Sequence, residues 1–410
     1  MKYYTFITIV LSIILLTVPL FSQKQTPPEG SQPKDFILPE SQKLTLENGL
    51  EVTMVQYGDL PKAMVRVVVR SGNLNESESS VWLADLTVDL MKEGAGDMDA
   101  GEIARKAASM GGAISTSVGL DQSSFGGEVL SEFTADLVAL LADIVQRPSF
   151  PEKEFERLKK DFLRNLNIQK TQSQSLAQEK FADVLYGNHP YGRVFPTEAM
   201  LNGYTLDQVK EFYDSNFGAL RAHIYVVGKF DSKKVENVIK SSFSNWKKGE
   251  EPLINIPKPQ SKRMIYLVER PDAPQSTIFM GLPVIDPTHA DFFPLLVTNT
   301  LLGGYFSSRI TSNIREDKGY TYSPRSRITN HYRDAFWVQT ADVSTDVTGA
   351  AIKEIFYEID RLQNEAPTAD ELAGVQNYMG GIFVLRNSSR GDIIGQLSFM
   401  KLHGLDDYLD

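Results

Sequence analysis

Residues 301–327, LLGGYFSSRITSNIREDKGYTYSPRSR, are the stretch from which the fold and the function of this chain are inferred. Gly303 and Gly304 are expected to adopt backbone angles that other residues resist, between the end of one helix and a short helix over residues 307–318. Gly319 is expected to end that helix in a left-handed cap, and a strand that carries Tyr322 should follow. Arg315 and Tyr322 would then flank one helix-to-strand corner, although the spacing alone favours a solvated arginine and a packed tyrosine.

The GGYFSSR start, the Arg315–Tyr322 spacing and the GYTYS ending resemble the second-domain signature of the M16 zinc peptidases, which include pitrilysin, insulinase and the mitochondrial processing peptidase. The resemblance implies an α+β fold of two tandem homologous domains, each a mostly antiparallel sheet with helices packed on it, as in LuxS-like metallohydrolases. It also implies that Arg315 and Tyr322 reach across a cleft and help to hold a peptide near a zinc ion that another domain carries.

The composition is that of an ordinary globular protein, and the first residues of the chain predict export. Its 410 residues are 42% hydrophobic and 23% charged, which is enough for two or more domain cores, and the net charge of −10 argues against a nucleic-acid binder. Residues 1–22 predict a secretory signal, because the apolar run is short for an uncleaved membrane anchor, and residues 23–40 predict a flexible leader. The absence of cysteine excludes disulfides, lipoprotein attachment and cysteine-ligated zinc. We therefore expect a periplasmic or extracellular protein.

Residues 79–92 predict a helix, with Ser79 or Ser80 as its N-cap, and this helix is where the chain departs from the M16 family. The family carries its His-x-x-Glu-His zinc motif here, with two histidine ligands and a glutamate that activates water. The matching residues of this chain are Asp85, Val88 and Asp89. The family's third ligand, a glutamate, should fall within residues 162–168, but that segment reads FLRNLNI and contains no acid. The resemblance therefore implies a degenerate zinc motif and no metal bound by this chain.

No other residues replace the missing ligands in the sequence. The five histidines are expected on the surface or in loops, and no two share ligand spacing on one helix: His189, His223, His289, His331 and His403. Asp85 and Asp89 share a helix face, but two carboxylates without further oxygen ligands make a poor site for Mg²⁺ or Ca²⁺. A solvated acidic face is the plainer interpretation.

The chain reads as two copies of one α+β unit. We expect a first domain over residues 41–249, a proline-rich linker over 250–262 and a second domain over 263–410 that is truncated at its C-terminus. The first domain should open with a hairpin over residues 43–54 around an Asn-Gly turn. Further predicted strands are 64–70, 113–119, 222–228, 263–269, 276–283 and 335–341; further predicted helices are 101–112, 129–147, 152–170, 204–217, 231–248, 290–302, 348–363 and one from 368.

These features predict a catalytically silent subunit of an M16-type peptidase. Arg315 and Tyr322 would hold the peptide, while zinc and hydrolysis would come from a partner subunit with an intact motif. One alternative is a binding or scaffold subunit without turnover, and another is a stand-alone peptidase with an unrecognised metal site. The two altered histidine positions and the missing glutamate speak against the stand-alone enzyme.

Overall fold

The computed structural model describes residues 40–405, which belong to one compact unit. The predicted signal sequence and nearly all of the predicted leader lie outside this range. The strands are β1 Ser41–Thr45, β2 Glu51–Gln56, β3 Lys62–Val69, β4 Gly94–Ala95, β5 Met98–Asp99, β6 Ser115–Val118, β7 Ser123–Leu130, β8 Ala222–Gly228, β9 Gln275–Val284, β10 Arg325–His331 and β11 Asp334–Ser344. The helices are α2 Leu83–Met91, α3 Ala100–Ser109, α4 Thr134–Gln146, α5 Glu152–Thr171, α6 Ser173–Tyr186, α7 Glu198–Gly203, α8 Leu206–Asn216, α9 Ser232–Phe243, α10 Phe292–Asn299, α11 Arg309–Thr311, α12 Thr348–Asn364, α13 Ala369–Arg386 and α14 Arg390–His403.

Single turns complete the described elements. The 3₁₀ turns are Asn73–Asn75, Ser131–Phe133, Pro190–Gly192, Ala219–Arg221 and Thr345–Val347, and the π-helical turns are Thr300–Gly304 and Ser312–Asp317. Within residues 40–405, none of the helices combines the length and the apolar character that crossing a bilayer requires.

The first half of the chain folds around a six-stranded sheet with the order β1-β2-β8-β3-β7-β6. All neighbours are antiparallel except β2 and β8, which run parallel. The predicted hairpin over residues 43–54 is confirmed as β1 and β2, and Gly49 takes a φ of +89° in its turn. Prediction missed β7 and assigned its last residues to the following helix, which begins at Thr134 instead of residue 129.

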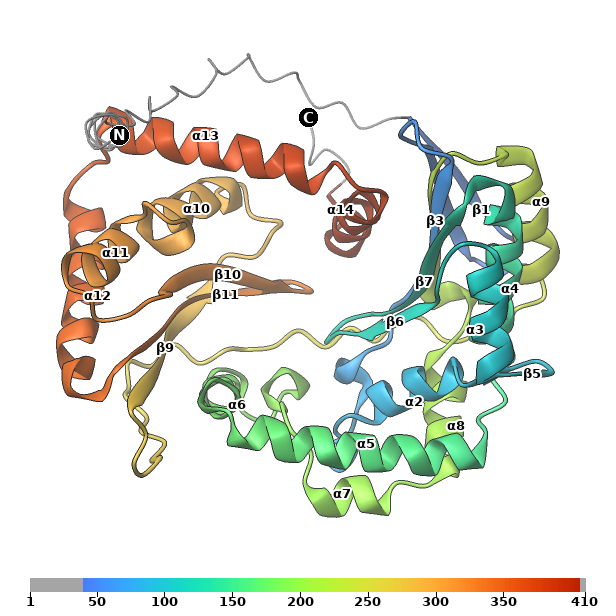
Figure 1. Cartoon of the computed structure of the whole chain (residues 1–410), viewed down its shortest axis with the longest axis horizontal. Helices are drawn as coiled ribbons and strands as arrows, with labels where there is room; N and C mark the ends of the chain where they lie inside the picture. Colours follow the sequence, from blue (N-terminus) through green and yellow to red (C-terminus); the bar gives the residue numbers. More distant parts are fainter. Residues whose placement is uncertain (1–39, 406–410) are drawn as a thin grey trace, which may run out of the picture. The chain divides into compact units, whose positions relative to one another are not determined.

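Side chains of β3 point alternately to the two faces of this sheet, and both faces carry apolar residues. Ala63, Val65, Val67 and Val69 are fully buried, and the three valines enter the main core, which α2, α4 and α9 complete. Figure 1 shows α3, α4 and α9 together on one side of this sheet. Val68 points to the other side, where Ile393 and Ile394 of α14 join the same cluster. A helix from the end of the chain thus covers the second face of the first sheet.

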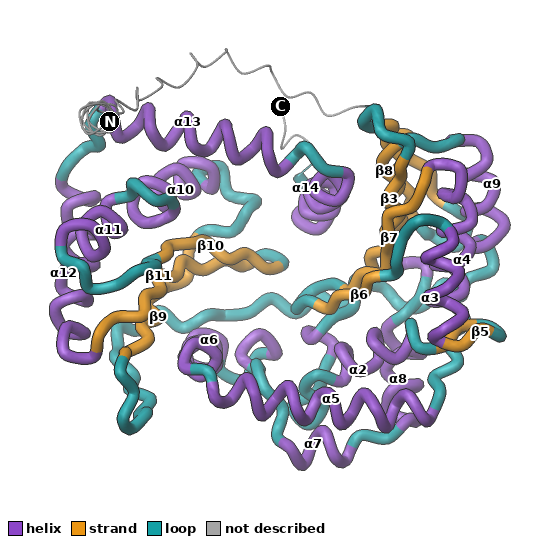
Figure 2. Tube along the Cα trace, in the orientation of Figure 1, coloured by secondary structure: helices purple, strands orange, loops and turns teal. Residues whose placement is uncertain are grey.

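The second half repeats part of the first. Its sheet has the order β10-β11-β9, with both pairs antiparallel, and this matches β6-β7-β3 in the first half. In both halves the central strand of this trio leads through a 3₁₀ turn into a long helix, α4 after β7 and α12 after β11. Figure 2 shows β9, β10 and β11 beside α10, α11 and α12. The two halves are two tandem domains of mixed α and β structure, as the repeat predicted.

Two predicted strands of the second half are wrong. Residues 263–269 form no strand, and Met264, Ile265, Tyr266, Leu267 and Val268 are exposed. The pattern RMIYLVE is typical of a strand, but no strand among residues 40–405 pairs with it. Tyr322 also lies outside any strand: its neighbour Thr321 forms a single bridge to Val343, and β10 begins only after Pro324.

Polar contacts join the two halves within the described unit. The hydroxyl of Tyr186, at the end of α6, donates to Asp334 of β11 at 2.5 Å. Asp121, in the turn before β7, accepts from the Tyr191 hydroxyl and from the backbone N–H of Tyr332. The β10–β11 hairpin is therefore held to the first half through buried or half-buried carboxylates.

Candidate functional site

Helix α2 carries the three residues at the positions of the M16 zinc motif. Val88 lies in the main core with 1% of its surface exposed, and Asp85 and Asp89 lie on the partly exposed side of the helix. The helix begins at Leu83, because Trp82 takes a left-handed conformation with φ of +68°, and the Trp82 side chain makes no capping hydrogen bond. The expected cap by Ser79 or Ser80 is therefore wrong: Ser80 bonds back to Ser77 at 2.7 Å.

Asp85 and Glu76 are two carboxyl groups that accept from the same donor, the Asn73 amide. The amide of Asn73 donates to Asp85 Oδ2 at 2.7 Å and to Glu76 Oε1 at 3.1 Å, and the backbone N–H of Ala84 donates to the same Glu76 oxygen at 2.8 Å. Burial raises the pKa of Glu76 to about 8, and the charge of Asp85 adds to this effect. Burial likewise raises the pKa of Asp85 to about 6. Both groups therefore hold protons above the pH at which free carboxyl groups release them.

Asp89 is paired with a cation of the protein itself. Lys92 Nζ lies 2.6 Å from Asp89 Oδ1, and the hydroxyl of Thr116 on β6 donates to the same oxygen at 3.2 Å. A lysine ammonium at this distance opposes the binding of a second cation, and the valine at position 88 offers no ligand or base. These residues do not fit a zinc ion.

The structure places the segment expected to hold the third ligand beside α2. Residues 162–168 lie in α5, where Leu166 is fully buried and Phe162 packs edge-on against Trp82 with ring centres 6.0 Å apart. Apolar and aromatic side chains thus fill the space between α2 and α5. Within residues 40–405, no group of three or more His, Asp or Glu side chains is arranged to hold a metal ion.

The histidines are less exposed than predicted. His189 and His289 lie in loops, as expected, but the other three occupy strands or helices. His223 of β8 bonds to Thr53 at 2.8 Å. His331 ends β10 and lies 4.7 Å from the ring centre of Tyr191, while His403 of α14 is fully buried. Burial lowers the pKa of His331, and it lowers that of His403 to about 4. Their surroundings make these three structural side chains.

Arg315 and Tyr322 are brought together on the surface of the second half. The guanidinium carbon of Arg315 lies 4.8 Å from the centre of the Tyr322 ring and 4.4 Å from that of Phe306. Tyr322 is 80% exposed and Phe306 is 60% exposed, so the cation contacts two rings that face solvent. Arg315 Nε lies 3.1 Å from a carboxylate oxygen of Glu316.

The local backbone fixes this arrangement. Arg315 lies in the π-helical turn Ser312–Asp317, which continues α11 and ends at Gly319 with φ of +64°, so the predicted helix and its left-handed stop are confirmed. Asn313 in the same turn donates to Glu354 and Glu358 of α12 at 3.0 and 2.8 Å. The turn that carries Arg315 is therefore anchored on a long helix.

Comparisons with known proteins agree with this architecture. The profile described as "Insulinase (Peptidase family M16)" matches residues 53–195, and the profile described as "Peptidase M16 inactive domain" matches residues 203–379. This chain belongs to the M16 peptidase family. The order of the two profiles matches the order of its two tandem domains.

M16 relatives cover most of the chain at low identity. The chain is 21% identical over 344 residues to the "Uncharacterized zinc protease YmxG" of Bacillus subtilis, a match that covers 84% of this chain and 83% of the relative. It is 23% identical over 341 residues to the "Non-peptidase homolog YmxG" of Helicobacter pylori, with 80% of this chain and 77% of the relative covered. A crystal structure described as a peptidase M16 inactive domain from Pseudomonas fluorescens shares the fold, with a TM-score of 0.82, 24% identity, and coverage of 90% of this chain and 89% of that chain.

Three residues near the family positions Asp85 and Arg315 were not singled out from the sequence. Asn73 and Glu76 lie in an irregular segment before α2, where no periodic pattern marks them. Phe306 was quoted only as part of the GGYFSSR start, and its place beside Arg315 depends on the fold. The sequence holds no signal that marks Phe306, because its exposure and its contact with Arg315 are seen only in the structure.

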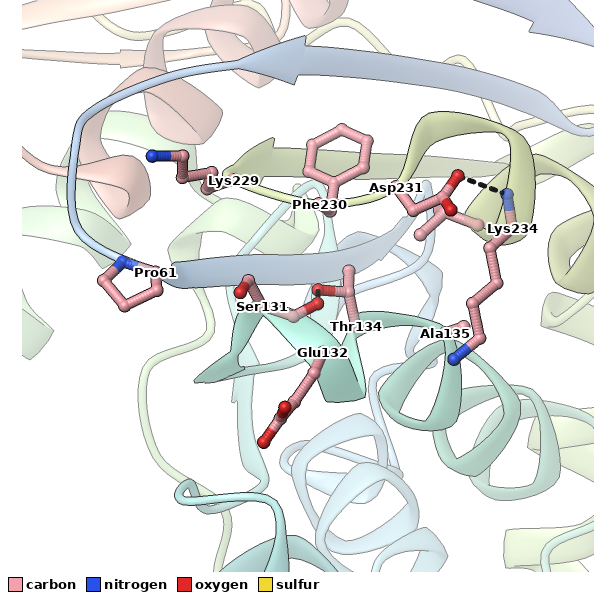
Figure 3. A pocket seen from close by; sticks show the side chains of 10 residues that line it. Pro61, Ser131, Glu132, Thr134, Ala135, Lys229, Phe230, Asp231 and Lys234 are labelled. Atoms are coloured by element: carbon pink, nitrogen blue, oxygen red, sulfur yellow. Dashed lines mark hydrogen bonds between the residues drawn. The ribbon is translucent and has the colours of Figure 1, made fainter.

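A pocket of about 490 Å³ lies elsewhere in the M16 first domain (Figure 3). Its lining includes Ser131 and Thr134 at the start of α4 and Asp231 and Lys234 at the start of α9. Two of the polar side chains drawn there are engaged in helix starts: Asp231 accepts from the backbone N–H of Lys234, and the Thr134 hydroxyl donates to the Ser131 carbonyl. This pocket shares no lining residue with the Arg315 stack.

Proposed function

We propose that this chain is a catalytically silent M16 subunit that holds peptide substrate for a partner subunit with an intact His-x-x-Glu-His motif. The observation that carries the proposal is the exposed stack of Arg315 on Tyr322, in a chain whose residues at the zinc-motif positions do not fit zinc. The name of the Helicobacter pylori relative, a non-peptidase homolog, agrees with a silent subunit.

Each residue of the pair has a distinct role in this proposal. The rings of Phe306 and Tyr322 both contact the Arg315 guanidinium and its Nε faces Glu316, so in this proposal its terminal N–H groups donate to a peptide carbonyl or carboxylate. The exposed hydroxyl of Tyr322 donates to the carbonyl oxygen that becomes negative during hydrolysis. A preorganised donor of this kind is worth about 2.7 to 4 kcal/mol. The partner's zinc would supply the hydrolytic chemistry, and this chain supplies binding and orientation.

The contacts around α2 support a fold that needs no metal. Asp85 and Asp89 take their hydrogen bonds from Asn73 and Lys92, and Val88 packs in the core. Because hydrogen bonds from the protein itself satisfy both carboxyl groups, the helix needs no metal ion to neutralise them. We also propose, from residues 1–22, that the protein acts after export, in the periplasm or outside the cell.

The test is a reconstitution with the candidate zinc-bearing M16 subunit. Hydrolysis of an unstructured peptide mixture is measured with zinc for this chain alone, for the partner alone and for both together. The proposal predicts activity in the mixture that is absent or much lower in either chain alone, and a loss of that gain with Tyr322→Phe. Tyr357→Phe, at a tyrosine of α12 that is 56% exposed, is the matched control.

Two results would contradict the proposal. Zinc-dependent hydrolysis by this chain alone would show a metal site that these residues do not provide. A mixture in which Tyr322→Phe and Arg315→Lys both retain full activity would favour the alternative of a scaffold subunit, in which the pair has no role in turnover.

A further inference from the structure

Phe306 is an exposed aromatic side chain at the edge of the Arg315 stack. It is 60% exposed, and its ring centre lies 4.4 Å from the guanidinium carbon of Arg315. A phenylalanine with this exposure gains little from the core of its own chain. Phe306 does not stand alone, because the exposed ring of Tyr322 contacts the same guanidinium, and apolar surface that adjoins polar groups in this way is typical of an interaction site.

The turn that carries Phe306 is anchored on both sides. The preceding residue, Tyr305, packs against Tyr378 of α13 with ring centres 5.1 Å apart. Earlier in the turn, Gly303 approaches β10 so closely that an added Cβ would lie 2.6 Å from the Cβ of Ser326. The close packing, not an unusual backbone angle, requires glycine at position 303. Phe306 is therefore held outward by packed neighbours instead of lying on a loose loop.

The stack combines a polar and an apolar binding surface. The guanidinium edge of Arg315 takes an oxygen acceptor, and the Phe306 ring offers an apolar face a few ångströms away. In an extended peptide, a backbone carbonyl and a neighbouring side chain lie at a similar separation. A peptide bound through its carbonyl at Arg315 would thus place one side chain over Phe306.

We infer that Phe306 is a specificity residue that selects peptides with a large apolar side chain next to the carbonyl or carboxylate bound by Arg315. This inference rests on the proposed function, because it requires that Arg315 binds peptide. It adds a substrate class, apolar at one position, to a site for which the family signature supplies only the arginine and the tyrosine.

The test is peptide binding to the full chain, followed by fluorescence anisotropy. The probes are two fluorescein-labelled decapeptides of Gly, Ser and Ala that differ at one central residue, Leu or Ser. We expect the Leu peptide to bind about tenfold more tightly, as partial burial of one leucine side chain predicts. Phe306→Ala should abolish this preference with an unchanged melting temperature, and Phe306→Leu should retain part of it. Phe356→Ala is the matched control, since Phe356 is an exposed α12 phenylalanine stacked beneath Arg263.

The outcomes separate this inference from the proposed function. If Phe306→Ala keeps the preference, or weakens the binding of both peptides equally, Phe306 is not a specificity residue. A loss of binding in Arg315→Lys would then still support the proposed function. If the wild-type chain binds neither peptide, or Arg315→Lys binds both as the wild type does, the proposed function fails and the inference fails with it.

Discussion

Arg315 lies over the ring of Tyr322, with its guanidinium carbon 4.8 Å from the ring centre. The two side chains come from different local structures, a π-helical turn and an irregular segment after Gly319. Tyr322 is 80% exposed, while the Arg315 side chain is 25% exposed. A cation and a phenol held together at the surface are available to a ligand, and this availability is the basis of the predictions on function.

Replacement of Tyr322 by phenylalanine should lower kcat in the reconstituted mixture by about a hundredfold, because it removes one donor to the developing negative charge. KM should change less than twofold, since the ring that packs on Arg315 remains. The measurement is steady-state hydrolysis of one fluorogenic peptide, with Tyr357→Phe as control. An equal loss in both variants would assign the effect to something other than the Tyr322 hydroxyl.

Replacement of Arg315 by lysine should raise KM about tenfold, because an ammonium keeps the charge but cannot offer a planar fork between two rings. The effect on kcat should be smaller. The same peptide assay over a range of substrate concentrations checks this prediction, and Arg386→Lys, at an exposed arginine of α13, is the control. An unchanged KM would mean that Arg315 does not contact the peptide.

Replacement of Val88 by glutamate restores the residue that the zinc motif has at this position, yet it should destabilise the protein. Val88 is 1% exposed in the main core, and an unpaired carboxylate there should lower the free energy of unfolding by about 3 kcal/mol or more. Urea unfolding measures the change, and Val384→Glu on the exposed side of α13 is the control. A loss as small as that of the control would show that position 88 reaches solvent.

Glu76 should make stability fall as the pH rises. Its pKa is raised in the folded protein from 4.5 to about 8, so the folded state keeps a proton that the unfolded state releases. The stabilisation from this group is complete below pH 4.5 and is lost progressively as the pH rises to about 8. Glu76→Gln keeps the acceptor for Ala84 N–H and cannot ionise, so at pH 9 it should exceed the wild type by on the order of 2 kcal/mol.

The control for this pH effect is Glu78→Gln, since Glu78 is exposed. Urea unfolding at pH 5, 7 and 9 compares both variants with the wild type. The raised pKa of Asp85, about 6, should leave some pH dependence below pH 7 in Glu76→Gln. A fall in stability between pH 7 and pH 9 that survives in this variant would place its origin in another group.

Much of the fold could be predicted because its signals are local. The Asn-Gly turn of the first hairpin, the break at Gly319 and the Thr368 cap of α13 each specify a structure through residues close in sequence. Helix α6 was missed because its sequence, SQSLAQEKFADVLY, has a weak apolar period. The strand expected at residues 263–269 failed for another reason: a strand requires a neighbour, and its own sequence does not show whether one is present.

The candidate site was predicted only in part. The family signature identified Arg315 and Tyr322, and the structure brings them together. Phe306 could not be identified from spacing, because its distance to Arg315 is set by the anchored turn around Gly303. The surroundings of Asp85 could not be predicted either, because the fold of the segment before α2 brings Asn73 and Glu76 close to it.

The central claim, that this chain touches peptide for a zinc-bearing partner, is tested most directly by cross-linking from position 322. A photoreactive benzoylphenylalanine in place of Tyr322 is irradiated in the reconstituted mixture with a labelled, uncleavable peptide, and Tyr357 carries the same group in the control. The account predicts that the peptide is captured at position 322 when the partner is present and is not captured at position 357. Equal capture at both positions, or no capture at position 322 in a mixture that hydrolyses peptides, would contradict it.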